Sequence, residues 1–115
     1  MTNALNTAMI YFDYSNNRDF EKIADMFTES STYSSQNTGV YLGARDIMEM
    51  TKFFFNSHEK LFWNIHSVEE IRPGVVKFDF TLEARRNNGE EYTKPGIEYV
   101  IIFENKIQHV EVRNK

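Results

Sequence analysis

The chain has 115 residues, of which 41% are hydrophobic and 26% charged, a composition typical of a globular domain and too apolar for a disordered segment. It contains no cysteine, which excludes disulfides, thiolate metal sites and a cysteine nucleophile. The 13 basic and 17 acidic residues give a net charge of −4, which disfavours contact with a phosphate backbone, so we expect no nucleic-acid partner. We predict one domain over residues 1–115.

Two further features of the composition bear on location and on the interior. No apolar stretch approaches the roughly 20 residues of a membrane helix, and the first residues lack the basic patch and apolar run of a signal peptide. We therefore expect a cytoplasmic protein that makes no membrane contact. Aromatic residues form 15% of the chain, which indicates a core of wide rings that could be hollow enough to hold a flat ligand.

The first half of the chain has the spacing of helices. Apolar residues recur every three or four positions over residues 4–16, after a cap at Thr2 or Asn3. Asp19 can cap a second helix. A short strand is expected over residues 30–35, then a loop, and a third amphipathic helix over residues 44–56.

The second half changes to the alternation of strands. We predict strands over residues 61–71, 75–86 and 91–104, the last interrupted by Pro95-Gly96, and a final strand over residues 107–113. Short turns between these strands imply a mostly antiparallel sheet. Helices followed by hairpins form an α+β arrangement, in which a curved sheet folds around the helices and closes a cone.

The alternation also predicts which side chains face the inside of this cone. Phe78 and Phe80 belong to the apolar face of their strand, and Val110 and Val112 to that of the last strand, with Ile107 on the opposite face.

A second apolar face is expected on the outside of the sheet. Residues 97–103 are apolar on both faces of their strand apart from Glu98. A second copy of the chain is the simplest cover for the outer face, so we predict a homodimer through it.

The order of elements and several motifs resemble the nuclear transport factor 2-like superfamily. The motifs are Tyr11-Phe12, Asn17-Arg18-Asp19-Phe20, Ile23 to Phe27 and Gly39 to Ile47, followed by the long hairpins. The resemblance covers about residues 4 to 113. It implies three N-terminal helices packed in the concave face of a strongly curved, mostly antiparallel sheet, the cystatin-like α+β cone shared by ketosteroid isomerase, polyketide cyclases and limonene epoxide hydrolase. Because unrelated activities share this cone, the resemblance specifies fold more than function.

The resemblance to ketosteroid isomerase implies a partial site. That enzyme, a worked example in studies of pKa tuning, uses an aspartate base and an oxyanion hole of a tyrosine and a protonated aspartate. Tyr11 matches the tyrosine, since it stands eight residues before Asp19 as in that family, and Glu98 falls at the acid. Ser35 falls at the base, and a serine there cannot shuttle a proton between carbons at neutral pH. The resemblance implies an oxyanion hole without its base, and no catalytic residue is assigned.

Each candidate has a structural alternative. Glu98 either opens to a cavity with a raised pKa or lies exposed near Lys94. Tyr11 either binds a ligand oxygen or packs in the core, and Trp63 walls the cavity, packs in the core or covers the sheet at the dimer. Tyr33 and Tyr41 are expected at the edge of the domain, with guarding of a cavity mouth as the alternative. The predicted pocket residues are Tyr11, Trp63, Phe78, Phe80, Glu98, Val110 and Val112.

No metal or other cofactor is expected. His58, His66 and His109 have no metal-ligand spacing, and no phosphate-binding motif is present. The leading hypothesis is a domain that binds a small, largely apolar or aromatic molecule. The alternatives are an isomerase-, cyclase- or hydrolase-like enzyme acting on a flat carbonyl compound, and a scaffold with a filled core. A cavity of roughly 300 Å³ or more would separate a ligand site from the scaffold.

Overall fold

The computed structural model describes residues 3–115, so a cap at Thr2 lies outside the described residues. Three helices come early in the chain: α1 (Asn3–Asn16), α2 (Phe20–Asp25) and α3 (Gly43–Asn56). The carboxylate of Asp19 accepts a hydrogen bond from the backbone N–H of Lys22, which caps α2 as predicted.

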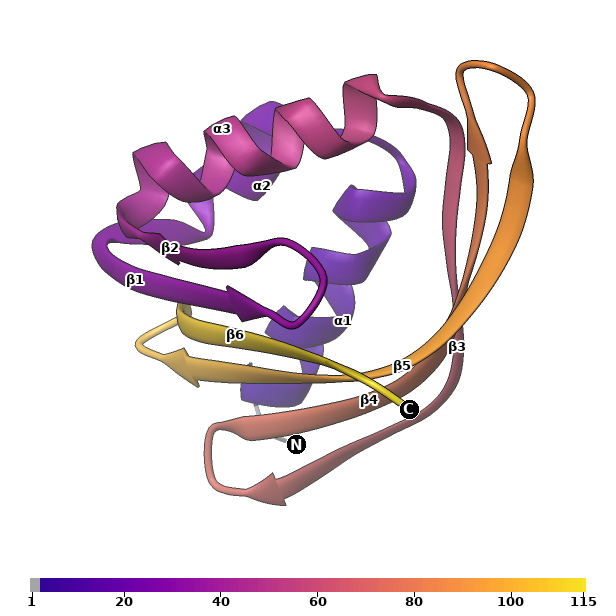
Figure 1. The fold of residues 1–115 in the computed structure, drawn as a ribbon. Helices are drawn as coiled ribbons and strands as arrows, with labels where there is room; N and C mark the ends of the chain where they lie inside the picture. The colour runs from indigo at the N-terminus through magenta and orange to yellow at the C-terminus, as the bar shows by residue number, and fades with distance from the viewer. Residues whose placement is uncertain (1–2) are drawn as a thin grey trace.

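The strands form one sheet. They are β1 (Phe27–Ser35), β2 (Gly39–Leu42), β3 (His58–Arg72), β4 (Val75–Arg86), β5 (Glu91–Phe103) and β6 (Lys106–Asn114). The six strands lie in the order β2-β1-β6-β5-β4-β3, and every neighbouring pair is antiparallel except β1 with β6. In Figure 1 the long strands β3, β4 and β5 curve around α1, and α3 lies across the open end. The predicted α+β fold class is confirmed.

Two of the differences from the predicted strands concern β2 and β5. Strand β2 was expected to be a loop, but it pairs with β1 across a tight turn. Strand β5 is continuous through Pro95-Gly96, which was predicted to interrupt it. Pairing of β5 with β6 begins only at Gly96, so Pro95 lies beyond the end of β6, where the lack of an N–H costs no ladder hydrogen bond.

The face assigned to Ile107 was wrong. Pairing between β5 and β6 shifts register between Ile101 and Ile102, and the irregularity turns the side chain of Ile107 into the core. Simple alternation along β6 could not show this shift, because it depends on the partner strand.

The core lies between the concave face of the sheet and the helices. Its fully buried members come from α2, α3 and the strands: Ile23, Ile47, Val76, Phe78, Val100, Ile107 and Val110. Within residues 3–115, none of the helices is both long and apolar enough to cross a membrane. The aromatic rings do not fill the whole cone, and the space that remains is the candidate site.

Candidate functional site

A cavity of about 310 Å³ opens between α1, α3 and the concave face of the sheet. Its wall is largely apolar, with these side chains: Phe12, Ile23, Met50, Phe54, Phe55, Trp63, Phe80, Leu82 and Val112. The polar groups come from both sides of the cone: Tyr11, Ser15, Tyr33, Ser35, Asn37, Thr38, Thr51, Arg86, Tyr92, Lys94, Glu98, Arg113 and Asn114. A largely apolar wall with a few polar groups is typical of a site for a small organic molecule.

Glu98 is the buried acid of this cavity. It lies on the concave face of β5, with Phe78 of β4 and Val112 of β6 as its register partners, and is only 3% exposed. Within residues 3–115 its carboxyl group makes no hydrogen bond and no ion pair, and the carboxyl oxygens keep contact with the space of the cavity. Burial raises its pKa from 4.5 to about 8, because the ionised form loses its solvation. At neutral pH the group is therefore mainly a carboxylic acid that can donate a hydrogen bond.

A pair of tyrosines accompanies this acid. Burial raises the pKa of Tyr11 on α1 and of Tyr33 on β1 well above 10, and the nearby Glu98 raises both further. The side chains of Tyr11 and Tyr33 also interact with each other. With raised pKa values both hydroxyls keep their protons at neutral pH, so each can donate a hydrogen bond.

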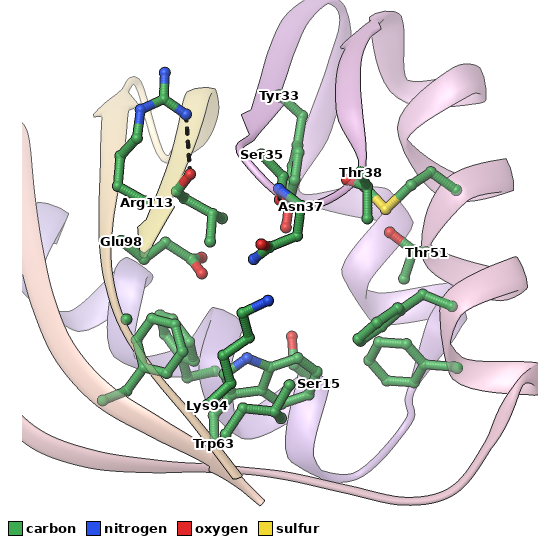
Figure 2. Close-up of a pocket in the computed structure, with 18 of the residues that line it drawn as sticks. Ser15, Tyr33, Ser35, Asn37, Thr38, Thr51, Trp63, Lys94, Glu98 and Arg113 are labelled. Carbon is green, nitrogen blue, oxygen red and sulfur yellow. Dashed lines mark hydrogen bonds between the residues drawn. The ribbon is translucent and has the colours of Figure 1, made fainter. Parts of the chain in front are cut away.

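The free ends of several polar side chains converge on the cavity. Figure 2 shows the side chains of Glu98, Asn37 and Lys94 pointing into the same space. The guanidinium of Arg113 is turned away and donates to the backbone carbonyl of Val112 at 2.9 Å. Ser35, at the position that the resemblance gives to a catalytic base, lines the cavity and accepts a hydrogen bond from the backbone N–H of Asn37 at 3.2 Å.

A buried histidine fixes one more group on the wall. His58 Nδ1 lies 2.9 Å from the backbone carbonyl oxygen of Phe54, which can only accept, so Nδ1 carries the proton. Nε2 then accepts a hydrogen bond from the Tyr92 hydroxyl at 2.8 Å. The guanidinium of Arg86 lies 4.7 Å from the centre of the Tyr92 ring. This end of the cavity is therefore held rigidly.

The three histidines do not form a common site. His66 lies on β3, where its Nε2 is 2.8 Å from the Thr81 hydroxyl, and His109 on β6 contacts Thr32 and Glu111. No group of three or more histidine, aspartate or glutamate side chains placed to hold a metal occurs within residues 3–115.

The structure brings most of the predicted pocket residues to one cavity. Tyr11, Trp63, Phe80, Glu98 and Val112 line it. Phe78 and Val110 share the same concave face but lie in the core and are not part of the cavity wall.

Trp63 both lines the cavity and packs against another ring. Its ring stacks on that of Phe55, with 5.6 Å between the ring centroids. Tyr33 was expected at the edge of the domain, but it lines the cavity. The alternation along β1 could have indicated this position, since Tyr33 and Ser35 lie on the same face of the strand.

Comparisons with known proteins identify the fold. No protein-family model matches the chain, and no curated protein matches it. A nuclear transport factor 2-like protein of unknown function from Burkholderia pseudomallei superposes with a TM-score of 0.89 at 11% identity, covering 100% of this chain and 92% of its own. An LEH-like epoxide hydrolase from Mycobacterium tuberculosis superposes with a TM-score of 0.85 at 11% identity, covering 97% of this chain and 82% of its own. TerC, co-crystallised with polyporic acid, superposes with a TM-score of 0.83 at 14% identity, covering 97% of this chain and 91% of its own.

These proteins are similar over nearly the whole chain, although their sequences have diverged widely. Superposition over nearly the whole chain, with TM-scores of 0.83 to 0.89, confirms the fold that the sequence motifs predicted. The chain has the nuclear transport factor 2-like fold.

Proposed function

We propose that the protein binds a small, largely apolar ligand in its cone and donates hydrogen bonds from Tyr33 and the protonated Glu98 to an oxygen of that ligand. The observation that carries the proposal is the buried Glu98 carboxyl group, which faces an apolar cavity of about 310 Å³ without a protein partner within residues 3–115. A buried polar group without a partner is costly, and a ligand oxygen would supply the missing hydrogen bond.

The protonation of the polar wall defines the kind of ligand oxygen. Tyr33 and Glu98 both line the cavity, and burial raises the pKa of each, so both carry a proton at neutral pH. Two donors aimed at one region favour an acceptor, such as a carbonyl or an enolate oxygen.

Binding is a better fit than proton-transfer catalysis. On the cavity wall formed by residues 3–115, Glu98 is the only carboxylic acid, and the wall contains no histidine. Abstraction of a proton from carbon would therefore depend on Glu98, which is ionised only above pH of about 8. A filled scaffold fits less well, because the cavity reaches the size expected of a ligand site.

The sole tryptophan allows a direct test. Trp63 lines the cavity, so quenching of its fluorescence reports binding there. The probes are 2-acetylnaphthalene and 2-isopropenylnaphthalene, which have similar shapes but differ by the carbonyl oxygen. We expect the wild type to prefer the ketone about 3- to 10-fold, the worth of one net hydrogen bond. The preference should fall as the pH rises through about 8, because Glu98 then loses its proton.

Variants separate the donors from the general shape of the cavity. Tyr33→Phe and Glu98→Leu should each lower the ketone preference while the hydrocarbon still binds. Tyr14→Phe is the matched control, because Tyr14 is on α1 but outside the wall of this cavity. If both probes fail to quench Trp63, or if the wild type does not distinguish them, the proposal is refuted.

We also propose that the protein is a homodimer through the outer face of the sheet. The outward side chains of β5 form an apolar strip of Ile97, Tyr99, Ile101 and Phe103, of which Phe103 is 63% exposed. A contiguous apolar strip on the exposed face of a sheet is typical of a protein–protein interface.

Light scattering tests the dimer. We expect twice the mass of one chain for the wild type and the mass of one chain for Ile101→Glu, since a charge would be buried without a partner. Val40→Glu is the control, because Val40 lies on β2, away from β5, and is 69% exposed. A wild type with the mass of one chain at working concentration would refute the homodimer.

A further inference from the structure

Besides its buried acid, the wall of the cavity carries a cation, Lys94, without a protein partner within residues 3–115. Lys94 is on the concave face of β5, opposite Leu82 of β4, and it is half-buried in the cavity wall. Figure 2 shows its side chain extending into the cavity. Within residues 3–115, the Lys94 ammonium group makes no hydrogen bond and no ion pair. A lysine on an apolar inner face usually extends its charge to water or to an anion.

The other two cations of the cavity wall are already engaged. The Arg86 guanidinium donates to the Glu90 carboxylate at 2.8 Å, and Arg113 forms an ion pair with Glu111. Lys94 is therefore the cation on the described part of the wall that is left for a ligand.

Glu98 and Lys94 form no ion pair, although their side chains extend into the same space. The pKa of Glu98 is raised by burial, with no contribution from Lys94. The cavity wall thus carries net positive charge at neutral pH, although the chain as a whole has a net charge of −4. A local cationic site with apolar walls attracts anions that the rest of the surface repels.

We propose that the ligand of this cavity is a flat organic anion, whose acidic group pairs with Lys94 while its apolar body lies along the aromatic wall. This inference rests on the proposed function, since it specifies the chemical class of the ligand that the same cavity binds. An anion paired with Lys94 would gain a charge-assisted hydrogen bond, which is stronger than a neutral one. Its acidic group would pair with Lys94, and an acceptor oxygen would face Glu98.

A pair of probes isolates the anionic group. 8-Anilinonaphthalene-1-sulfonate and N-phenyl-1-naphthylamine have the same ring system, and only the first carries a sulfonate. Each is titrated against the protein, with quenching of Trp63 as the signal that binding occurs in the cavity. The measured quantity is the ratio of the Kd of the sulfonate to the Kd of the neutral amine, because this ratio cancels changes in apolar contact.

Two substitutions at Lys94 and one control define the result. Lys94→Met should raise the Kd ratio about tenfold, as expected for loss of one charge-assisted hydrogen bond. Lys94→Arg keeps the charge and should change the ratio less than about threefold. Lys77→Met is the control, because Lys77 lies on the outer face of the neighbouring strand β4, outside the cavity wall. Added salt should raise the Kd of the sulfonate and leave that of the amine unchanged.

The outcomes distinguish this inference from the proposed function. If the neutral amine binds to every variant and Lys94→Met leaves the Kd ratio unchanged, the inference of an anionic ligand is refuted, while the proposed binding of an apolar ligand stands. If Lys77→Met raises the ratio as much as Lys94→Met, the sulfonate is attracted by general charge and the inference is again refuted. If neither probe quenches Trp63 in the wild type, both the inference and the proposed function fail.

Discussion

Replacing Glu98 by glutamine should stabilise the protein more as the pH rises. The carboxyl group is buried and has a pKa of about 8 in the folded chain, against 4.5 as its ordinary value. Between these two values the folded protein holds a proton that the unfolded chain has released. Wild-type stability therefore falls as the pH rises from about 4.5 to about 8, whereas a glutamine at this position does not titrate.

The size of the effect follows from the two pKa values. Because one unit of pKa is worth about 1.4 kcal/mol, the cost of Glu98 is close to zero at pH 4, about 3 kcal/mol at pH 7 and about 5 kcal/mol at pH 9. For a chain of this length, about 1 kcal/mol corresponds to about 4 °C in Tm. Relative to the wild type, the Tm of Glu98→Gln should rise by about 12 °C between pH 4 and pH 7.

The assay is thermal and urea unfolding of both proteins from pH 4 to pH 9. All other titrating groups are shared by the two proteins, so they cancel in the difference between the free energies of unfolding. Glu59→Gln is the control, since Glu59 is exposed on β3 and stays in contact with water. A difference between Glu98→Gln and the wild type that does not change with pH would refute the reasoning, because it would mean that Glu98 is ionised in the folded protein.

Three further substitutions test the packing and the caps. In Gly96→Ala the new Cβ would lie 2.7 Å from the Phe80 ring, so we expect a loss of about 1–3 kcal/mol in urea unfolding, and an unchanged midpoint would contradict this contact. Asp19→Ala removes the acceptor for the Lys22 N–H and should cost about 1 kcal/mol, whereas Asp19→Asn, which retains an acceptor, should cost less. Ser31→Ala leaves buried backbone groups without partners and should lower the stability by about 1–3 kcal/mol; a loss below about 0.5 kcal/mol would show that the groups find other partners.

Local patterns in the sequence determined most of the elements. The change of period from helical spacing to alternation placed the strands after the third helix, and the alternation of Phe78 and Phe80 identified the concave face of β4. The cap at Asp19 was visible because it depends on a hydrogen bond to a residue three positions away. These features are set by neighbours in the chain, so the chain alone shows them.

Pairing between strands and contacts between distant segments decided the rest. Strand β2 exists because it pairs with β1, and Ile107 faces inward because β5 and β6 shift register. Tyr33 of β1 joins the site because the fold brings it to the same cavity as Tyr11 of α1. No local pattern encodes such pairings.

The site divides in the same way. The sequence singled out Glu98 because a carboxylic acid in an apolar strand needs a partner or a cavity. Only the tertiary structure shows that the helices leave this space open, that the acid has no partner among residues 3–115, and that Lys94 faces the same cavity. The physical reason is that a residue's type fixes its need for solvation, whereas the packing of distant elements decides how that need is met.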